Sequence, residues 1–193
     1  VTLASNIENL VLDSNYGYGK GNSLDNVITA QGMASVGSNQ LYGMGGNATL
    51  IGDKGSNTLD GGTGNDHLAG GSGKLDTYIF TSGNDTIDAY DTDNGADVLK
   101  ISGFTKNDIW LNRNDDDLIV SMIGSNNSIT VQDWYLDTNH KLDNISIGTE
   151  TLTTVEVESL VHAMAAFTPP SGAMNYIEVA AREAMKPIIA ASW

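Results

Sequence analysis

Glycine recurs at every ninth position through much of the first half of the chain, and this period limits the possible folds more than any other feature. The phased glycines are Gly37, Gly46, Gly55, Gly64 and Gly73. A leucine follows four residues after each of the first four, at Leu41, Leu50, Leu59 and Leu68. Agreement at two independent positions is the signature of an internal repeat, and short repeats of this kind predict a solenoid.

On this period the chain contains the nine-residue units Ala34–Tyr42, Gly43–Ile51, Gly52–Asp60 and Gly61–Ala69. The unit that begins at Gly70 takes one extra residue before Asp76, and the phase resumes in Phe80–Asp88. In each unit the glycines permit a tight turn. The short strand that follows points its leucine inward. One unit cannot bury its leucine alone, so we expect stacked units with a shared core.

The sixth position of each unit should form a row along the turns. It is occupied by Asn39, Ala48, Asn57, Asp66, Asp76 and Asp85. Stacked carboxylates surrounded by turn carbonyls repel one another unless a cation lies between the layers. Ca2+ is the expected ion, because hard oxygen ligands select hard cations.

The charge balance agrees with bound cations. The chain has 24 acidic and 9 basic residues, a net charge of −15, yet 40% of its residues are hydrophobic, unlike a disordered acidic tail. Such a charge disfavours a nucleic-acid partner. The sequence has no cysteine, which excludes disulfides and thiolate metal sites.

The segment GGTGNDHLA (Gly61–Ala69) is similar to the nonapeptide GGxGxDxUx of the RTX (repeats-in-toxin) family, where U is a large apolar residue. The resemblance implies a mainly β protein, a parallel β-roll with Ca2+ between successive turns on the same side. Asn39, Asn57 and Asp76 would then share one edge, and Ala48, Asp66 and Asp85 the other. We expect few sites, concentrated in residues 52–97. The candidate metal-binding residues are Asp53, Asn57, Gly61, Gly64, Asp66, Asp76, Asp85, Asp88, Asp91 and Asp97.

Three regions are expected along the chain. Residues 1–97 form the roll, with degenerate turns in 1–33, a break in phase at Ala30–Met33, and phased nonapeptides in 34–97. The acidic residues between Asp85 and Asp97, including Asp93, are interpreted as a calcium loop that closes the last turn; the alternative is a solvated acidic loop.

Residues 98–152 read as an antiparallel meander of short strands. The expected strands are Asp108–Arg113, Asp117–Ile123, Ser128–Tyr135 and Asn144–Gly148. Asp115–Asp117 is predicted to be a hairpin tip rather than a metal triad, because three adjacent side chains cannot converge on one ion.

Residues 153–193 are expected to be helical. Thr153 and Glu156 form a capping box, and Val157, Leu160, Val161 and Met164 follow a helical period. A second helical pattern runs from Ile177 to Ala184. A purely structural role would be to cap the apolar end of the solenoid. The segment also resembles the ends of large exported RTX proteins, which implies an uncleaved C-terminal signal for a type I secretion system; the two are compatible.

No catalytic constellation is visible in the sequence. The three histidines, His67, His140 and His162, have no zinc-site spacing, and no nucleophile motif is present. The chain is therefore not expected to be an enzyme. The best membrane-span candidate, Val155–Phe167, is short and contains Glu156 and Glu158, so we expect no transmembrane segment.

We therefore predict a calcium-dependent folding and export module at the C-terminus of a secreted or surface RTX protein such as an adhesin. It is expected to be monomeric, to engage the type I machinery through its tail, and to lie outside the cell or on the bacterial surface without a cleaved N-terminal signal peptide. Because the sequence starts at Val1, we expect a fragment of something longer. Two alternatives stay open: the same module attached to a secreted lipase, protease or polysaccharide epimerase, or a recognition surface for a glycan.

Overall fold

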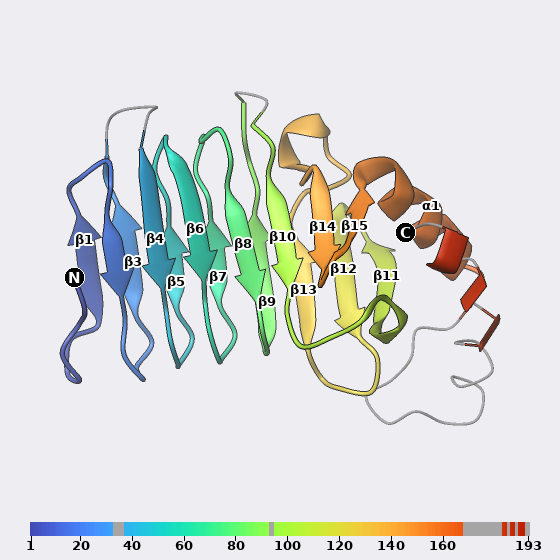
Figure 1. The fold of residues 1–193 in the computed structure, drawn as a ribbon, viewed down its shortest axis with the longest axis horizontal. Coiled ribbons are helices and arrows are strands. Elements are labelled where there is room, and N and C mark those ends of the chain that lie inside the picture. Colours follow the sequence, from blue (N-terminus) through green and yellow to red (C-terminus); the bar gives the residue numbers. More distant parts are fainter. Residues whose placement is uncertain (33–36, 93–94, 168–182, 185, 188, 192–193) are drawn as a thin grey trace.

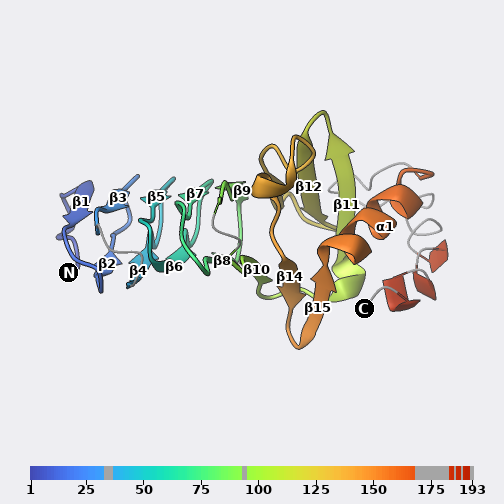
Figure 2. The same ribbon diagram turned by 90° about the horizontal axis from the view of Figure 1, so that it is seen from above.

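A computed structural model describes residues 1–32, 37–92, 95–167, 183–184, 186–187 and 189–191. Short strands alternate between two sheets that lie face to face (Figure 1, Figure 2). One sheet has the order β1-β3-β5-β7-β9-β13-β12-β11, and the other β15-β14-β10-β8-β6-β4-β2. The fold is a parallel β-roll with one C-terminal helix, as the sequence predicts.

The roll is built from strands of three to five residues. Those of the first sheet are β1 (Asn9–Leu12), β3 (Val27–Ala30), β5 (Thr49–Ile51), β7 (His67–Ala69) and β9 (Asn84–Asp88). Those of the second are β2 (Tyr18–Lys20), β4 (Ser38–Tyr42), β6 (Ser56–Asp60), β8 (Thr77–Phe80) and β10 (Val98–Ile101). Each strand pairs in parallel with the strand two places along the chain.

The repeated leucines form the core between the two sheets. Leu41 and Leu59 are register partners in one sheet, and Leu50 and Leu68 are partners in the other. All four side chains are buried. Ile28 continues the row toward the N-terminus, which places the degenerate N-terminal turns in the same stack. Each buried leucine contributes about 2 kcal/mol relative to an exposed one.

The sequence after residue 98 does not form a purely antiparallel meander. The strands there are β11 (Ile109–Asn114), β12 (Asp117–Met122), β13 (Ser128–Val131), β14 (Asn144–Ile147) and β15 (Glu150–Thr153). The neighbours β11, β12 and β13 pair antiparallel, as do β14 and β15. However, β13 pairs in parallel with β9, and β10 pairs in parallel with both β8 and β14.

The roll thus continues beyond the expected boundary at residue 98. A rung of the roll, meaning one strand together with the turn that precedes it, does not need the glycine period. It needs only alternate apolar side chains that point inward. Ile129 and Val131 supply them in β13, and Ile145 and Ile147 supply them in β14. The segment between β10 and β13, which contains β11 and β12, is therefore a long insertion between two rungs of the roll.

The predicted hairpin tip joins β11 and β12. Asp115 has φ 53°, and Asn114 pairs with Asp117 across the turn. The Arg113 guanidinium donates to the Asp115 carbonyl at 2.6 Å and contacts Asp116 at 3.3 Å.

Helix α1 (Thr154–Met164) covers the C-terminal end of the sheets and contacts β11 and β15 (Figure 2). The expected capping box forms between Thr153 and Glu156, and the buried side chains are Val157, Leu160, Val161 and Met164. Glu158 accepts hydrogen bonds from Trp134 Nε1 at 2.9 Å and Lys141 Nζ at 2.7 Å. Most of the second predicted helix lies outside the described residues. Among the helices that the structure describes, none is long and apolar enough to cross a bilayer.

Candidate metal centre

The residues at the sixth repeat position stack into two rows, one on each edge of the roll. On one edge the backbone N–H of Asn57 donates to Asp76 Oδ1 at 2.7 Å, and that of Asp76 donates to Asp97 Oδ1 at 2.8 Å. On the other edge the N–H of Ala48 donates to Asp66 Oδ1 at 2.7 Å. The Asp66 N–H donates to Asp85 Oδ1 at 3.0 Å. Alternate units share an edge, as the sequence predicts.

Two of these carboxylates leave their second oxygen without a partner. Asp66 Oδ2 and Asp76 Oδ2 are buried and accept no hydrogen bond. Leaving a buried charged acceptor unpaired costs about 1–3 kcal/mol or more. A cation beside each oxygen would remove this cost, and carboxylate and carbonyl oxygens are the ligands that Ca2+ takes. The donor set therefore fits calcium.

The unpaired oxygens point into the turns of their own units. A Cβ placed on Gly61 would lie 2.1 Å from Asp66 Oδ2, and one on Gly70 would lie 2.3 Å from Asp76 Oδ2. Glycine at the first position therefore leaves the space in which the carboxylate lies. A Cβ on Gly83 would lie 1.6 Å from the carbonyl oxygen of Gly64. That carbonyl therefore lies between two rungs on the edge of Asp66 and Asp85, where a bridging cation would bind.

Burial raises the pKa of these carboxyl groups. It raises the pKa of Asp76 to about 8, with a further contribution from the charge of Asp97. It raises the pKa of Asp85 to about 7, with a contribution from the charge of Asp66. The pKa of Asp66 is also raised, chiefly by burial. Each group is thus stable in the fold either as a neutral acid or as a carboxylate beside a cation.

Asparagine at the sixth position produces a different local structure. Asn57 Nδ2 donates to the carbonyls of Gly55 at 2.8 Å and Gly70 at 3.0 Å, and to Asp76 Oδ1 at 3.1 Å. Asn39 Nδ2 donates to Asp53 Oδ2 at 2.9 Å. The amide carries its own donors, so these turns satisfy their oxygens without an ion.

This hydrogen bonding argues against two of the predicted calcium ligands. The Nδ2 group of Asn57 occupies the centre of its oxygen cluster, where a cation would have to bind. Asp53 accepts from Gly55 N at 2.8 Å through Oδ1 and from Asn39 through Oδ2. The repeat position alone does not distinguish an amide that replaces an ion from a ligand that binds one.

One member of the row was not predicted from the sequence. Asp143 Oδ2 accepts from the backbone N–H of Asp97 at 2.8 Å, which extends the edge of Asp76 and Asp97 by one rung. Asp143 immediately precedes β14, just as Asp76 and Asp97 immediately precede β8 and β10. That position before a strand is the signal that could have found it.

A cavity of about 140 Å³ lies beside this last rung. Its lining residues are Asp91, Gly95, Asp97, Thr138, Asn139, Lys141 and Asp143. The Asp91 N–H donates to the Asn139 carbonyl at 2.8 Å, which holds the expected acidic loop against the 138–143 segment. Asp88 Oδ1 instead accepts from Tyr90 N at 3.1 Å in a local turn. Asp93 lies outside the described residues.

Within the described ranges, no group of three or more acidic or histidine side chains gathers closely enough to chelate a metal. Any bound ion therefore needs backbone carbonyls as well as carboxylates, which is typical of calcium. The three histidines stay apart from these rows: His67 is on β7, His162 is on α1, and His140 contacts Asp137 at 2.9 Å.

Comparison with protein families bears on the repeats directly. Residues 35–74 match the family model of the RTX calcium-binding nonapeptide repeat, in four copies. The matched segment covers β4 to β7 and the turns around them, and the same rung structure extends on both sides of it. Residues 35–74 are therefore similar to RTX nonapeptide repeats, and that repeat family binds calcium.

Proposed function

We propose that the chain is a non-catalytic module of a secreted RTX protein, in which calcium binding drives the folding of the C-terminal half of the roll. The observation that carries this proposal is the pair of buried, unpartnered oxygens Asp66 Oδ2 and Asp76 Oδ2. Burying them without ions lowers the free energy of unfolding, and ions that bind beside them raise it.

The mechanism follows from linkage between binding and folding. When calcium is scarce, buried carboxylates repel one another and disfavour the stacked rungs. When calcium is abundant, each ion that binds only the folded state adds its binding free energy to folding. An export pathway that needs an unfolded chain would then deliver a polypeptide that folds in the calcium-rich medium outside.

The asparagine rungs divide this roll into two parts. Asn26, Asn39 and Asn57 are buried, and their amides donate to oxygens of neighbouring turns. We infer that residues 9–57 can stack without ions and that the rungs from Asp66 onward need them. The N-terminal part would then offer preformed edges on which the ion-dependent rungs assemble.

The adhesin context, the surface location and the type I export signal in residues 153–193 rest on resemblance to the ends of exported RTX proteins. The docking of α1 supports the capping part of that proposal, because its apolar face is buried against β11 and β15. Within that segment, residues 168–182, 185, 188 and 192–193 lie outside the described part of the chain.

The proposal is tested by titrating calcium into chelator-treated protein while far-UV circular dichroism is recorded. We expect β-structure to increase at micromolar to millimolar calcium, with Mg2+ at equal concentration as the control, because Mg2+ gives up its water reluctantly. A spectrum that chelator and calcium leave unchanged would refute ion-driven folding.

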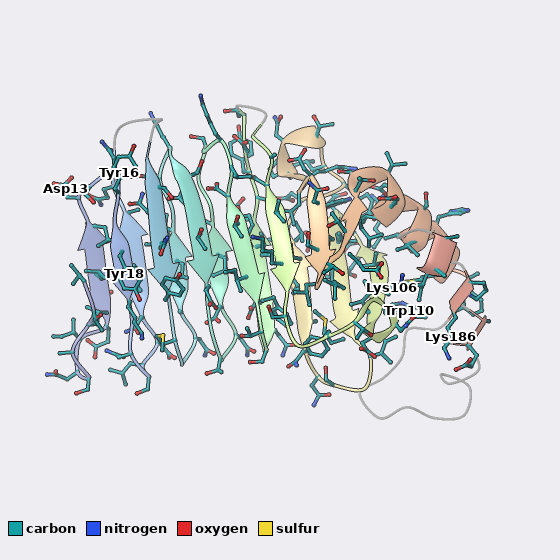
Figure 3. The ribbon with its side chains drawn as sticks, in the orientation of Figure 1. Asp13, Tyr16, Tyr18, Lys106, Trp110 and Lys186 are labelled. Carbon is teal, nitrogen blue, oxygen red and sulfur yellow. The ribbon has the colours of Figure 1, made fainter. Side chains whose placement is uncertain are left out.

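A recognition surface is the second candidate, and one observation favours it. Tyr18 and Tyr42 lie on the same sheet with ring centroids 5.4 Å apart, and Tyr18 is exposed on the N-terminal part of the roll (Figure 3). Exposed aromatic rings offer flat apolar surfaces to sugar rings. Quenching or shift of tyrosine fluorescence on addition of oligosaccharides, lost in Tyr18→Ala, would support this candidate. A response equal in both proteins would count against it.

A further inference from the structure

Asp60 is a carboxylate that the RTX nonapeptide does not specify. It is the last residue of β6 and occupies the ninth position of its unit, immediately before Gly61. The backbone N–H of Gly62 donates to its carboxylate. Its Oδ1 atom is buried and accepts no hydrogen bond. One oxygen of Asp60 is therefore turned away from solvent and left without a partner, as in Asp66 and Asp76.

The charge of Asp60 acts on the edge that carries Asp66 and Asp85. It raises the pKa of both carboxyl groups, after the larger effect of burial. The turn that follows Asp60 is also linked to the next rung, because Thr81 Oγ1 donates to the Gly62 carbonyl at 2.8 Å. Asp60 also immediately precedes Gly61, where an added Cβ would lie 2.1 Å from Asp66 Oδ2, so the chain at Asp60 runs beside the unpaired oxygen of Asp66.

Asp88 provides an internal comparison, because it occupies the same ninth position in its own unit and also ends its strand. Its Oδ1 atom accepts from Tyr90 N at 3.1 Å. Neither of its oxygens is among the buried, unpartnered atoms of the described chain. Its charge acts on Tyr78, on the opposite edge from Asp66. A carboxylate at the ninth position is therefore not in itself a neighbour of a candidate ion.

We propose that Asp60 tunes the cation site of Asp66 and Asp85 by charge, raising its affinity for Ca2+ and its preference for trivalent over divalent ions, without coordinating the ion itself. This inference rests on the proposed function, since it requires that the site binds calcium. Three carboxylates carry more charge than one Ca2+ neutralises, so a trivalent ion of similar size gains more from Asp60. The buried, unpartnered oxygen of Asp60 would then lie in the field of a nearby positive charge, which offsets the missing hydrogen-bond donor.

The test is a calorimetric titration of Ca2+ and, separately, La3+ into the chelator-treated chain. Asp60→Asn keeps the shape and removes the charge, Asp60→Glu keeps the charge, and Asp115→Asn at the β11–β12 turn is the charge-matched control. We expect Asp60→Asn to weaken calcium binding at one site by about 10-fold, because it removes a negative charge that attracts the ion. It should weaken La3+ binding more, so that the La3+ preference falls.

Asp60→Glu should restore the La3+ preference, and Asp115→Asn should retain it. An Asp60→Glu variant that behaves like Asp60→Asn would show that Asp60 has a structural role only and would overturn the inference. Unchanged binding in Asp60→Asn would overturn it too. In an Asp66→Ala background, Asp60→Asn should have little further effect on binding. If the parent chain itself takes up no calcium, the proposed function fails, and this outcome is distinct from either result with Asp60.

Discussion

The backbone N–H of Asp66 donates to Asp85 Oδ1 at 3.0 Å, so that each carboxylate in this row is bonded to the rung before it. This bond accounts for one oxygen of Asp85. The corresponding bond from Ala48 accounts for one oxygen of Asp66, and its other oxygen has no partner. The backbone hydrogen bonds along this row are therefore all made, but no positive charge among the described residues balances its carboxylates.

Replacing Asp66 with alanine should remove one calcium-binding site. The variant loses the buried oxygen that an ion would contact, and it also loses the acceptor of the Ala48 N–H. We expect a lower calcium affinity and a stoichiometry reduced by one, measured by calorimetry. Asp115→Asn at the β11–β12 turn is the control, since asparagine tolerates its positive φ. Parent-like binding by Asp66→Ala would show that the repeats have been placed in the wrong phase.

Replacing Asn57 with aspartate should make a calcium-independent rung depend on calcium. The variant loses the amide donor to Gly55, Gly70 and Asp76 and places a carboxylate among their oxygens. In chelator we expect a loss of about 3 kcal/mol in unfolding free energy, the cost of an unpaired buried charge. In excess calcium most of that loss should be recovered, with one additional ion bound. Thermal unfolding and calorimetry measure both. Equal destabilisation with and without calcium would contradict this prediction.

Without calcium, the stability of the roll should fall as the pH rises. Burial raises the pKa of Asp85 to about 7 and that of Asp76 to about 8, from an ordinary 3.8. The folded state therefore binds these protons more tightly than the unfolded state does. Their contribution to stability is complete below pH 3.8 and is lost as the pH rises through 7 and 8.

Melting temperatures of metal-free protein between about pH 5 and pH 9 measure this effect. We expect a decline across the range in chelator and a much smaller one in saturating calcium, because bound ions replace the protons. Calcium affinity itself should weaken toward the acidic end. A metal-free roll that becomes more stable from pH 5 to pH 9 would contradict the assignment of raised pKa values.

The helical cap should contribute to stability independently of calcium. Leu160 is fully buried, and its helix contacts β11 and β15. Leu160→Ala should reduce the unfolding free energy by about 2–5 kcal/mol, through lost burial and the cavity left behind. Val155→Ala is the matched control on the exposed face of the same helix. Chemical denaturation in saturating calcium measures the difference, and a similar effect of both substitutions would argue against docking of this face.

Removal of residues 168–193 separates the two roles proposed for the C-terminal segment. The truncated chain keeps α1 but loses the buried side chain of Ile189, so we expect calcium-induced folding at a similar calcium concentration with a lower unfolding free energy. Secretion from cells that carry a type I transporter should be lost. Undiminished secretion would refute the export signal, and loss of calcium-induced folding would show that the removed residues belong to the folded unit.

The nine-residue period was enough to predict a solenoid, and its resemblance to the RTX nonapeptide implied the roll and the sharing of one edge by alternate units. The offset of one unit places Asp66 and Asp85 on one edge and Asn57 and Asp76 on the other whatever the details of the turns. The period could not predict the later rungs. Asp97 meets Asp143 across 46 residues of sequence, and this contact depends on the path of the intervening segment.

Whether a given residue binds an ion was harder to predict than where that residue lies. Whether Asn57 binds an ion or replaces one depends on the carbonyls that its amide reaches, and those come from Gly55 in its own unit and Gly70 in the next. The burial of Asp60 Oδ1 depends similarly on the turn that follows, in which the Gly62 N–H donates to the same carboxylate. Such properties arise from packing between units and are not visible in one unit of sequence.

The direction of the rung-to-rung bonds has a mechanical consequence. The N-terminal end of the roll and helix α1 lie at opposite ends of its long axis, and the hydrogen bonds between rungs run along that axis (Figure 1). Tension applied between the two ends would therefore load the rungs in series, and the weakest one would open first. Ions that join successive rungs would resist force in the direction of pull, so the amide-bonded N-terminal rungs should yield before the aspartate-bearing ones.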